Sequence, residues 1–118
     1  MGRRKSPERL EAERLEREYN EQLDRRVEQI KSFIDDHKIT DGDIYENYRR
    51  ILGCEEIIRK NEEEIRELSS EEDGAFTKSA INSRKGLIEC EKHIRIGRIM
   101  DAEDAIKKYK LEKGMKAE

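Results

Sequence analysis

The chain has 118 residues, of which 47% are charged and 33% hydrophobic, with no Trp and a net charge of −3 at pH 7. Such a short, polar chain forms one domain at most and lacks the material for a thick globular core. The near-neutral charge excludes a polycation that binds nucleic acid or anionic membranes as a whole. No apolar run approaches the ~18 residues of a membrane span, and no signal-peptide core follows the basic start. We therefore expect a soluble, cytoplasmic protein that binds no membrane and whose two cysteines are thiols.

The charge is unevenly distributed along the chain. Residues 1–38 carry ten Lys/Arg and ten Asp/Glu, residues 39–74 carry five and twelve, and residues 75–118 carry eleven and seven. An acidic middle segment therefore precedes a basic last segment, and we expect the two to be partly complementary if they pack together.

Ser6 and Pro7 mark the start of a first helix. The Ser hydroxyl can accept a hydrogen bond from an otherwise unpaired amide, and Pro at the first helical position loses no hydrogen bond. Apolar residues then recur every three or four positions, although few occur in the first half of the segment, where Glu and Arg alternate. We expect a helix over about 7–36, preceded by a flexible basic arm at 1–5. The apolar stripe comprises Leu15, Tyr19, Leu23, Val27, Ile30 and Ile34.

A second helix is expected over about 41–68, where Thr40-Asp41-Gly42-Asp43 predicts a capping box at its start. One seam repeats at heptad spacing along this helix, which is typical of a helix that contacts a partner helix along a narrow stripe. We interpret the two asparagines in the seam as polar positions that fix the alignment of the helices rather than as ligand contacts. The seam comprises Ile44, Asn47, Ile51, Cys54, Ile58, Asn61, Ile65 and Leu68.

A third helix is expected over about 75–113, after a turn at 69–74 in which Ser, Glu, Asp and Gly replace the apolar seam. Gly97 permits either a break in this helix or a close contact between helices. The predicted seam of the third helix comprises Ala80, Ser83, Leu87, Cys90, Ile94 and Gly97.

The short turn near residue 72 predicts that the second and third helices form an antiparallel hairpin. In that register the numbers of facing residues add up to about 144 or 145, so Ile58 faces Leu87 and Cys54 faces Cys90. The same arithmetic brings the first helix alongside the second. The predicted fold is all-α: a single domain with an elongated antiparallel helical hairpin and a long amino-terminal helix, in a three-helix, coiled-coil-like bundle.

Several apolar residues of the third helix find no partner in this arrangement. A thin bundle cannot cover them all, and apolar residues left on one face usually indicate self-association or a docked protein. We therefore expect a homo-oligomer or a partner protein at a surface that comprises Ile96, Ile99, Ile106, Tyr109 and Leu111.

Cys54, Cys90 and His93 form the only constellation with metal-ligand chemistry. A structural zinc site needs four ligands, and no convincing fourth residue is present. We therefore expect buried, inert thiols rather than a metal site or a disulfide.

Basic side chains dominate the first half of the third helix and the start of the chain. They could follow a phosphate backbone, or they could flank the acidic second helix as a complementary face; we favour the second interpretation. The set comprises Arg3, Arg4, Lys5, Lys78, Arg84, Lys85, Lys92, Arg95 and Arg98.

Nothing in the sequence indicates catalysis. The two histidines lie far apart, no glycine-rich phosphate loop is present, and neighbouring carboxylates occur only in runs typical of a solvated surface. We expect a non-enzymatic protein without a cofactor or a small-molecule substrate.

The order of the parts over about residues 20–100 resembles the small terminase subunits of tailed bacteriophages. The residues that carry the resemblance are the helix entry Thr40-Asp41-Gly42-Asp43-Ile44-Tyr45-x-x-Tyr48, the acidic turn, and the Lys/Ser-containing start of the third helix. The resemblance implies rings built from helical hairpins, binding of double-stranded viral DNA in an infected host cell, and DNA-facing residues among the basic set. The chain lacks the helix-turn-helix expected near its start. We expect an interaction or assembly protein, with DNA packaging as the alternative.

Overall fold

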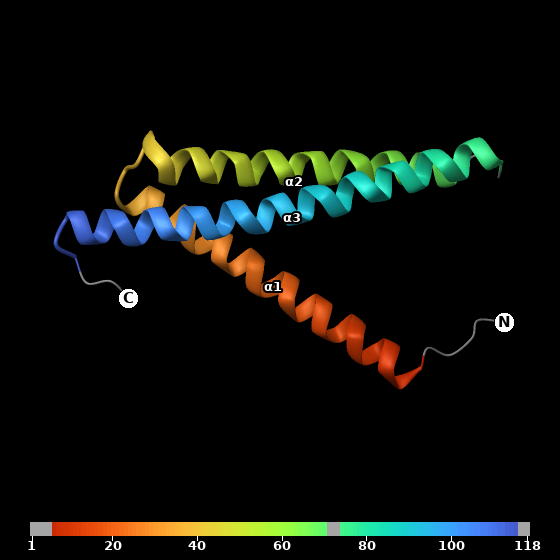
Figure 1. Cartoon of the computed structure of the whole chain (residues 1–118), viewed down its shortest axis with the longest axis horizontal. Coiled ribbons are helices and arrows are strands. Elements are labelled where there is room, and N and C mark those ends of the chain that lie inside the picture. Colours follow the sequence, from red (N-terminus) through yellow and green to blue (C-terminus); the bar gives the residue numbers. More distant parts are fainter. Residues whose placement is uncertain (1–5, 71–73, 116–118) are drawn as a thin grey trace.

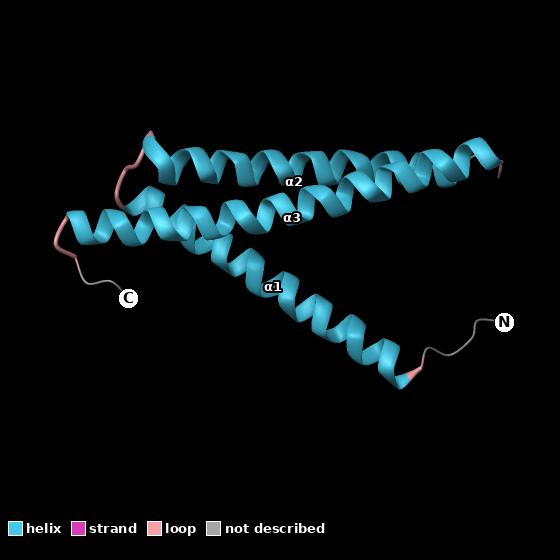
Figure 2. Cartoon of the chain, in the orientation of Figure 1, coloured by secondary structure: helices cyan, strands magenta, loops and turns pink. Residues whose placement is uncertain are grey.

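The computed structural model describes residues 6–70 and 74–115, and these form three α-helices without a strand (Figures 1 and 2). The helices are α1, Pro7–Asp36; α2, Gly42–Ser69; and α3, Ala75–Glu112. The predicted all-α hairpin with a long amino-terminal helix is confirmed. The predicted basic arm at 1–5, with Arg3, Arg4 and Lys5, lies outside the described residues.

α2 and α3 lie antiparallel, side by side, and run along the long axis of the molecule (Figure 1). The molecule measures 60 × 33 × 18 Å. α3 continues through Gly97 without a break. A Cβ atom placed at Gly53, Gly86 or Gly97 would meet nothing within 4 Å. Close helix contact is therefore not the reason for glycine at these positions, and both alternatives expected for Gly97, a break or a close contact, were wrong.

The ends of the first two helices differ in how they are capped. Ser6 Oγ accepts a hydrogen bond from the Arg9 amide at 3.2 Å, as the Ser-Pro start predicts. The predicted capping box of α2 is wrong, because its N-cap Asp41 makes no side-chain capping bond. The next residue, Gly42, has φ of +84°, a left-handed conformation that favours glycine. The turn therefore depends on this glycine's backbone rather than on a reciprocal pair of side-chain bonds.

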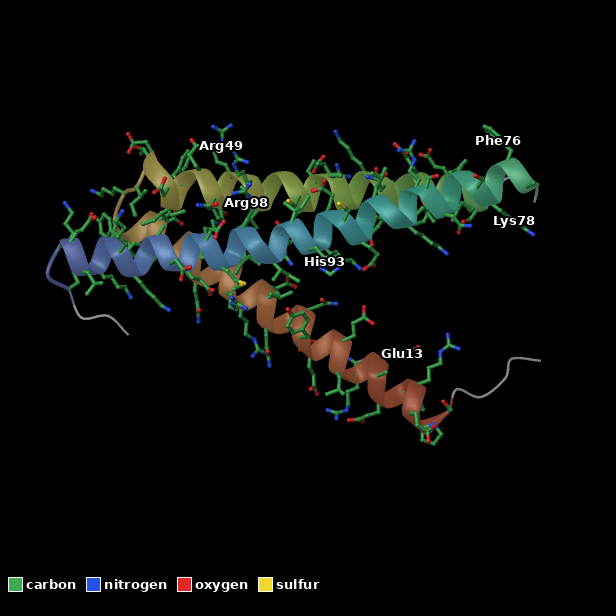
Figure 3. The ribbon with its side chains drawn as sticks, viewed as in Figure 1. Glu13, Arg49, Phe76, Lys78, His93 and Arg98 are labelled. Carbon is green, nitrogen blue, oxygen red and sulfur yellow. The ribbon has the colours of Figure 1, made fainter. Side chains whose placement is uncertain are left out.

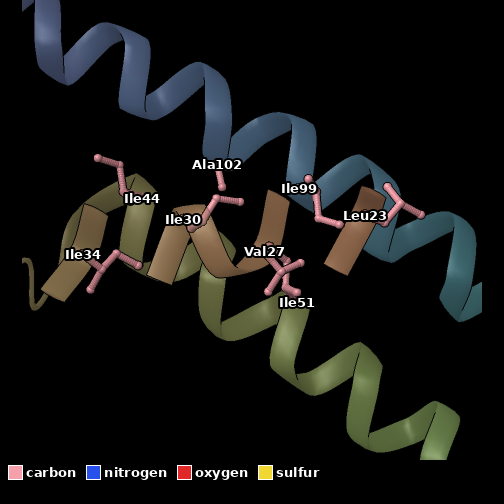
Figure 4. Packing of buried hydrophobic residues seen from close by; sticks show 8 residues of the cluster. All are labelled: Leu23, Val27, Ile30, Ile34, Ile44, Ile51, Ile99 and Ala102. Carbon is pink, nitrogen blue, oxygen red and sulfur yellow. The ribbon is translucent and has the colours of Figure 1, made fainter. Parts of the chain in front are cut away.

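The hydrophobic core lies where all three helices meet, near the α1–α2 connection (Figure 4). Ile30, Ile51 and Ile99 are almost completely buried in this core. A fully buried isoleucine side chain stabilises a fold by about 1.5–3 kcal/mol. α1, α2 and α3 all contribute to this cluster. It comprises Leu23, Val27, Ile30, Ile34, Ile44, Ile51, Ile99 and Ala102.

α1 takes part in this core only through its second half. We call residues 23–36 the inner half of α1 and residues 7–22 its outer half. The outer half diverges from the hairpin (Figure 1), and none of its residues is buried. Leu15 and Tyr19, which continue the apolar stripe of the inner half, are 53% and 47% exposed. The three-helix packing is therefore confined to one end of the molecule.

The predicted seam of α2 lies in the hairpin. All eight of its residues are buried or half-buried, with Ile51, Cys54 and Asn61 among the most buried. The predicted seam of α3 is largely wrong, because only Ala80 is half-buried. The exposed members are Ser83, Leu87, Cys90, Ile94 and Gly97.

The residues of α3 that contact α2 each follow a residue of the predicted seam by one position. Arg84 donates to Asn61 Oδ1 at 3.4 Å, and Arg98 donates to Asn47 Oδ1 at 3.5 Å. The numbers of these partners add up to 145, so the axial register is as predicted, but α3 is turned by about 100°. The physical reason is that long arginine stems can cover a seam while their guanidinium groups reach polar partners, a possibility that an apolar pattern does not reveal. Ile81, Ile88 and Ala102 are the apolar residues on this face.

The expectation that the carboxyl-terminal part of α3 finds no partner within the chain was wrong for most of its residues. Ile99 is fully buried in the core, and Ile96, Ile106 and Tyr109 pack against it. The inner half of α1 provides the partner: the ring centroids of Phe33 and Tyr109 lie 5.6 Å apart, edge to face. Leu111 is the exception, at 68% exposed.

Candidate protein-interaction groove

A groove of about 740 Å³ lies where α1 diverges from the hairpin, and all three helices line it. Its apolar lining includes Leu23 of α1, Tyr48, Leu52 and Ile58 of α2, and Ile96 of α3. Leu52 lines this groove and is nevertheless 43% exposed, so solvent reaches the lining. The groove is therefore an open, partly apolar surface between helices rather than an enclosed cavity.

Charged side chains of both signs border the groove, and Tyr48 lies between them. Burial raises the pKa of the Tyr48 phenol, and the nearby carboxylates of Glu55, Glu28 and Asp35 raise it further. The phenol consequently stays protonated and neutral around pH 7. A neutral hydroxyl in an apolar lining gives this surface a hydrogen-bonding group without the cost of burying a charge.

Two arginines fix the position of α1 on the hairpin. Arg95 of α3 donates to Asp24 of α1 and to Glu55 of α2, both at 2.9 Å, and its side chain is only 13% exposed. Arg26 of α1 makes two hydrogen bonds to Glu103 of α3, at 2.9 and 2.5 Å, and these raise the pKa of the guanidinium. The bidentate Arg26–Glu103 pair constrains direction as well as distance. Together with the buried side chains of the inner half, these pairs hold α1 on the hairpin.

Several residues of the basic set predicted from the sequence form ion pairs with carboxylates of the same chain. Arg84 contacts Glu64 of α2 at 2.8 Å, and Arg95 bridges α1 and α2 as described. Arg84 and Arg95 thus pair with carboxylates of acidic α2. Arg98 lies 3.7 Å from Asp101, in addition to its contact with Asn47, and Lys92 lies 3.6 Å from Glu89. Lys78 and Lys85 are exposed and form no ion pair with any residue in the described ranges.

The two cysteines and His93 do not form a metal site. Cys54 of α2 is buried in the hairpin, whereas Cys90 of α3 is exposed. Burial raises the pKa of the Cys54 thiol to about 11, and a hydrogen bond to Glu91 adds to this effect. Within residues 6–70 and 74–115, no three or more His, Cys, Asp or Glu side chains come together in a way that could hold a metal ion. Both cysteines are free thiols, and Cys54 is buried as expected, but the expectation that Cys90 is buried was wrong.

Sequence reasoning missed the groove and part of the exposed apolar surface. Leu87 and Ile94 were assigned to the hairpin seam, but they are 47% and 42% exposed. Phe76, at the start of α3, is 89% exposed and was not singled out. The available signal was the sparse apolar stripe in the first half of α1, which indicates a helix that the hairpin does not fully cover. Figure 3 shows Glu13 on this outer half, far from the labelled residues of the hairpin.

No helix in the described part of the chain combines the length and apolar character needed to cross a membrane. No protein-family model, curated protein or solved structure matches the chain.

Proposed function

We propose that this chain is a non-enzymatic interaction protein that binds an amphipathic helix in the groove between α1 and the hairpin. The observation that supports this proposal is the divergence of α1, which leaves the partly apolar lining of the groove open. Helices commonly bind such grooves through apolar residues spaced by three and four positions, which occupy the groove while their polar face stays in water.

The contacts between the walls of the groove also support this function. One wall is α1, which Arg95 and Arg26 link to the other wall, the hairpin. A groove that exists before its partner arrives loses less conformational entropy on binding than one that must form around the partner. The charged border then supplies orientation and specificity.

The experiment is a display selection of amphipathic helical peptides of about 18 residues against the immobilised chain, at a concentration too low for self-association. A helix of this length extends about 27 Å, enough to follow the stretch of α1 that lines the groove, from Glu16 to Lys31. Selected peptides should carry apolar residues at helical spacing. They should lose affinity for Leu52→Glu, because a carboxylate in the lining would lose water on binding.

Ile57→Glu is the matched control. Ile57 lies on the same helix and is 42% exposed, against 43% for Leu52, but it does not line the groove. Peptides that bind Leu52→Glu as tightly as the original chain would contradict a function at this groove.

DNA packaging in the manner of a small terminase subunit is the second candidate. Lys78 and Lys85 support it: they are exposed, lie seven residues apart on α3, and have no carboxylate partner among the described residues. Binding to double-stranded DNA should weaken steeply with salt, with a log–log slope of about −0.9 for each phosphate contacted. Lys78→Glu with Lys85→Glu should weaken it further without breaking the pairs of Arg84 and Arg95. An absence of binding at low salt would eliminate this candidate.

A further inference from the structure

We infer that the helix bound in the groove belongs to a partner protein and is basic, with Lys or Arg side chains along the edge that meets α1. This inference rests on the proposed function, because it names the charge of the partner at the same groove. The apolar lining favours an amphipathic helix of any charge, and the charged lining distinguishes among such helices.

The charged side chains that line the groove are mostly acidic. Five are carboxylates and three are Lys or Arg, a net charge of −2 with His93 counted as neutral. α1 and α2 supply four of the carboxylates and one of the cations, whereas α3 supplies one carboxylate and two cations. The side of the groove formed by α1 and α2 therefore favours a cation. The five carboxylates are Glu16, Asp24 and Glu28 of α1, Glu55 of α2 and Glu89 of α3.

Two of the three cations in the lining are already paired within the chain. Arg95 lies 2.9 Å from both Asp24 and Glu55, and Lys92 lies 3.6 Å from Glu89. The side chain of Arg95 is only 13% exposed, so it offers little to a partner. These two cations are therefore engaged by three of the five carboxylates, and they leave the other two carboxylates without a counter-charge from α3.

Glu16 and Glu28 are the carboxylates that a cationic partner can reach. Both are exposed and form no ion pair with any residue in 6–70 or 74–115, so a new contact displaces none. They lie about 18 Å apart along the axis of α1. Tyr19, one turn after Glu16, also lines the groove and is 47% exposed. A Lys or Arg beside Glu16 can therefore contact a carboxylate and lie against an aromatic ring.

The surroundings of Tyr48 show the same excess of negative charge. Burial raises the pKa of this phenol, and the carboxylates of Glu55, Glu28 and Asp35 raise it further. Negative charges that disfavour a phenolate favour a cation at the same place. The long stems of Lys and Arg can also cover apolar lining while their charged ends reach the carboxylates. A basic helix therefore suits both the apolar and the charged parts of the groove.

The test uses three helical peptides of about 18 residues that share one apolar face and carry Lys, Gln or Glu on the polar face. Their affinity for the full chain is measured by fluorescence anisotropy at low and high salt. At low salt the Lys peptide should bind at least about tenfold tighter than the Glu peptide, with the Gln peptide between them. The difference should shrink at high salt, because salt screens exposed charges. Equal affinities, or tighter binding of the Glu peptide, would overturn the inference.

Glu16→Gln with Glu28→Gln should weaken binding of the Lys peptide by about threefold to tenfold and leave that of the Gln peptide unchanged. Glu46→Gln with Glu67→Gln is the matched control. It changes the net charge by the same amount, and these two glutamates of α2 are exposed and do not line the groove. The control should bind the Lys peptide as the original chain does. Equal effects of the two double substitutions would show that overall charge decides, and would also overturn the inference.

Leu52→Gln separates this inference from the proposed function, because it removes apolar lining without a change of charge. If all three peptides bind equally and lose affinity for this variant, the groove binds helices and only the assigned charge is wrong. If the Lys peptide binds the variant as tightly as the original chain, it binds elsewhere, and both the assigned charge and the groove function are contradicted. An absence of binding by all three peptides would contradict both as well.

Discussion

The inner and outer halves of α1 belong to one continuous helix, and their apolar residues follow the same spacing. The inner half contributes four buried residues to the core, whereas the outer half contributes none. The difference arises from what faces each half: the inner half meets Ile44, Ile51 and Ile99 of the hairpin together, while the outer half diverges from both helices. An apolar stripe therefore indicates which face of a helix will be buried, but the surrounding helices decide where that face is covered.

The ion pairs of the two halves differ in the same way. The inner half forms pairs with distant parts of the chain, through Arg26 and Asp24. In the outer half, Arg14 instead pairs with Glu11 and Glu18 of the same helix, and hydrogen bonding to Arg14 lowers the pKa of Glu11. Local pairs of this type typically contribute about 0.3–0.5 kcal/mol each to a helix. They support the outer half as a helix without fixing its position.

The largest expected effect comes from removing a core side chain that holds the inner half. Ile51→Ala should lower the free energy of unfolding by about 2–5 kcal/mol, because Ile51 is fully buried between α1 and α3. Leu15→Ala, measured below the concentration of self-association, should change it by less than about 0.5 kcal/mol. Urea unfolding of the two variants measures both values. A similar loss for both would contradict the contrast between the halves.

A smaller effect is expected from the pairs that help to hold α1 on the hairpin. Arg95→Gln should lower the free energy of unfolding by about 1–3 kcal/mol, because it removes charged hydrogen bonds made by a side chain that is mostly buried. Arg59→Gln is the control, since among the described residues Arg59 pairs with exposed Glu56 and Glu63 of its own helix, and its loss should change the free energy of unfolding much less. If Arg95→Gln costs no more than this control, the bridge does not hold α1 in place.

The smallest effect on the whole molecule is expected from the cap of the outer half. Ser6→Ala removes the bond to the Arg9 amide, and such caps typically contribute about 1 kcal/mol to their helix. Because the outer half has no contacts with the core, the loss should increase hydrogen exchange near the start of α1 and leave exchange in the inner half unchanged. Faster exchange throughout α1 would mean that the two halves unfold together.

The helix limits and the axial register of the hairpin could be predicted from the sequence because local signals specify them. Ser6, Pro7 and the polar turn before Ala75 mark helix ends, and the heptad spacing in α2 and α3 specifies how far the two helices are shifted. The rotation of α3 could not be predicted. Ile81 and Ile88 repeat at the same spacing as Leu87 and Ile94, so two neighbouring rows fit equally well. The choice depends on long-range bonds from Arg84 and Arg98 to asparagines of α2.

The groove could not be predicted because it depends on an angle between helices. Contacts between residues 71 and 77 positions apart, Arg95–Asp24 and Arg26–Glu103, help to hold α1 on the hairpin. Neither contact leaves a periodic signal in the sequence. The sequence could identify the outer half of α1 as poor in apolar residues, but not the surface that this half leaves open.

Hydrogen exchange along α1 tests the contrast between its two halves most directly. Protection of the inner half should be strong, because four of its side chains are buried in the core. Protection of the outer half should be low, because none of its residues is buried. Strong protection of the outer half would contradict this account, since it would mean that α1 packs along its own hairpin.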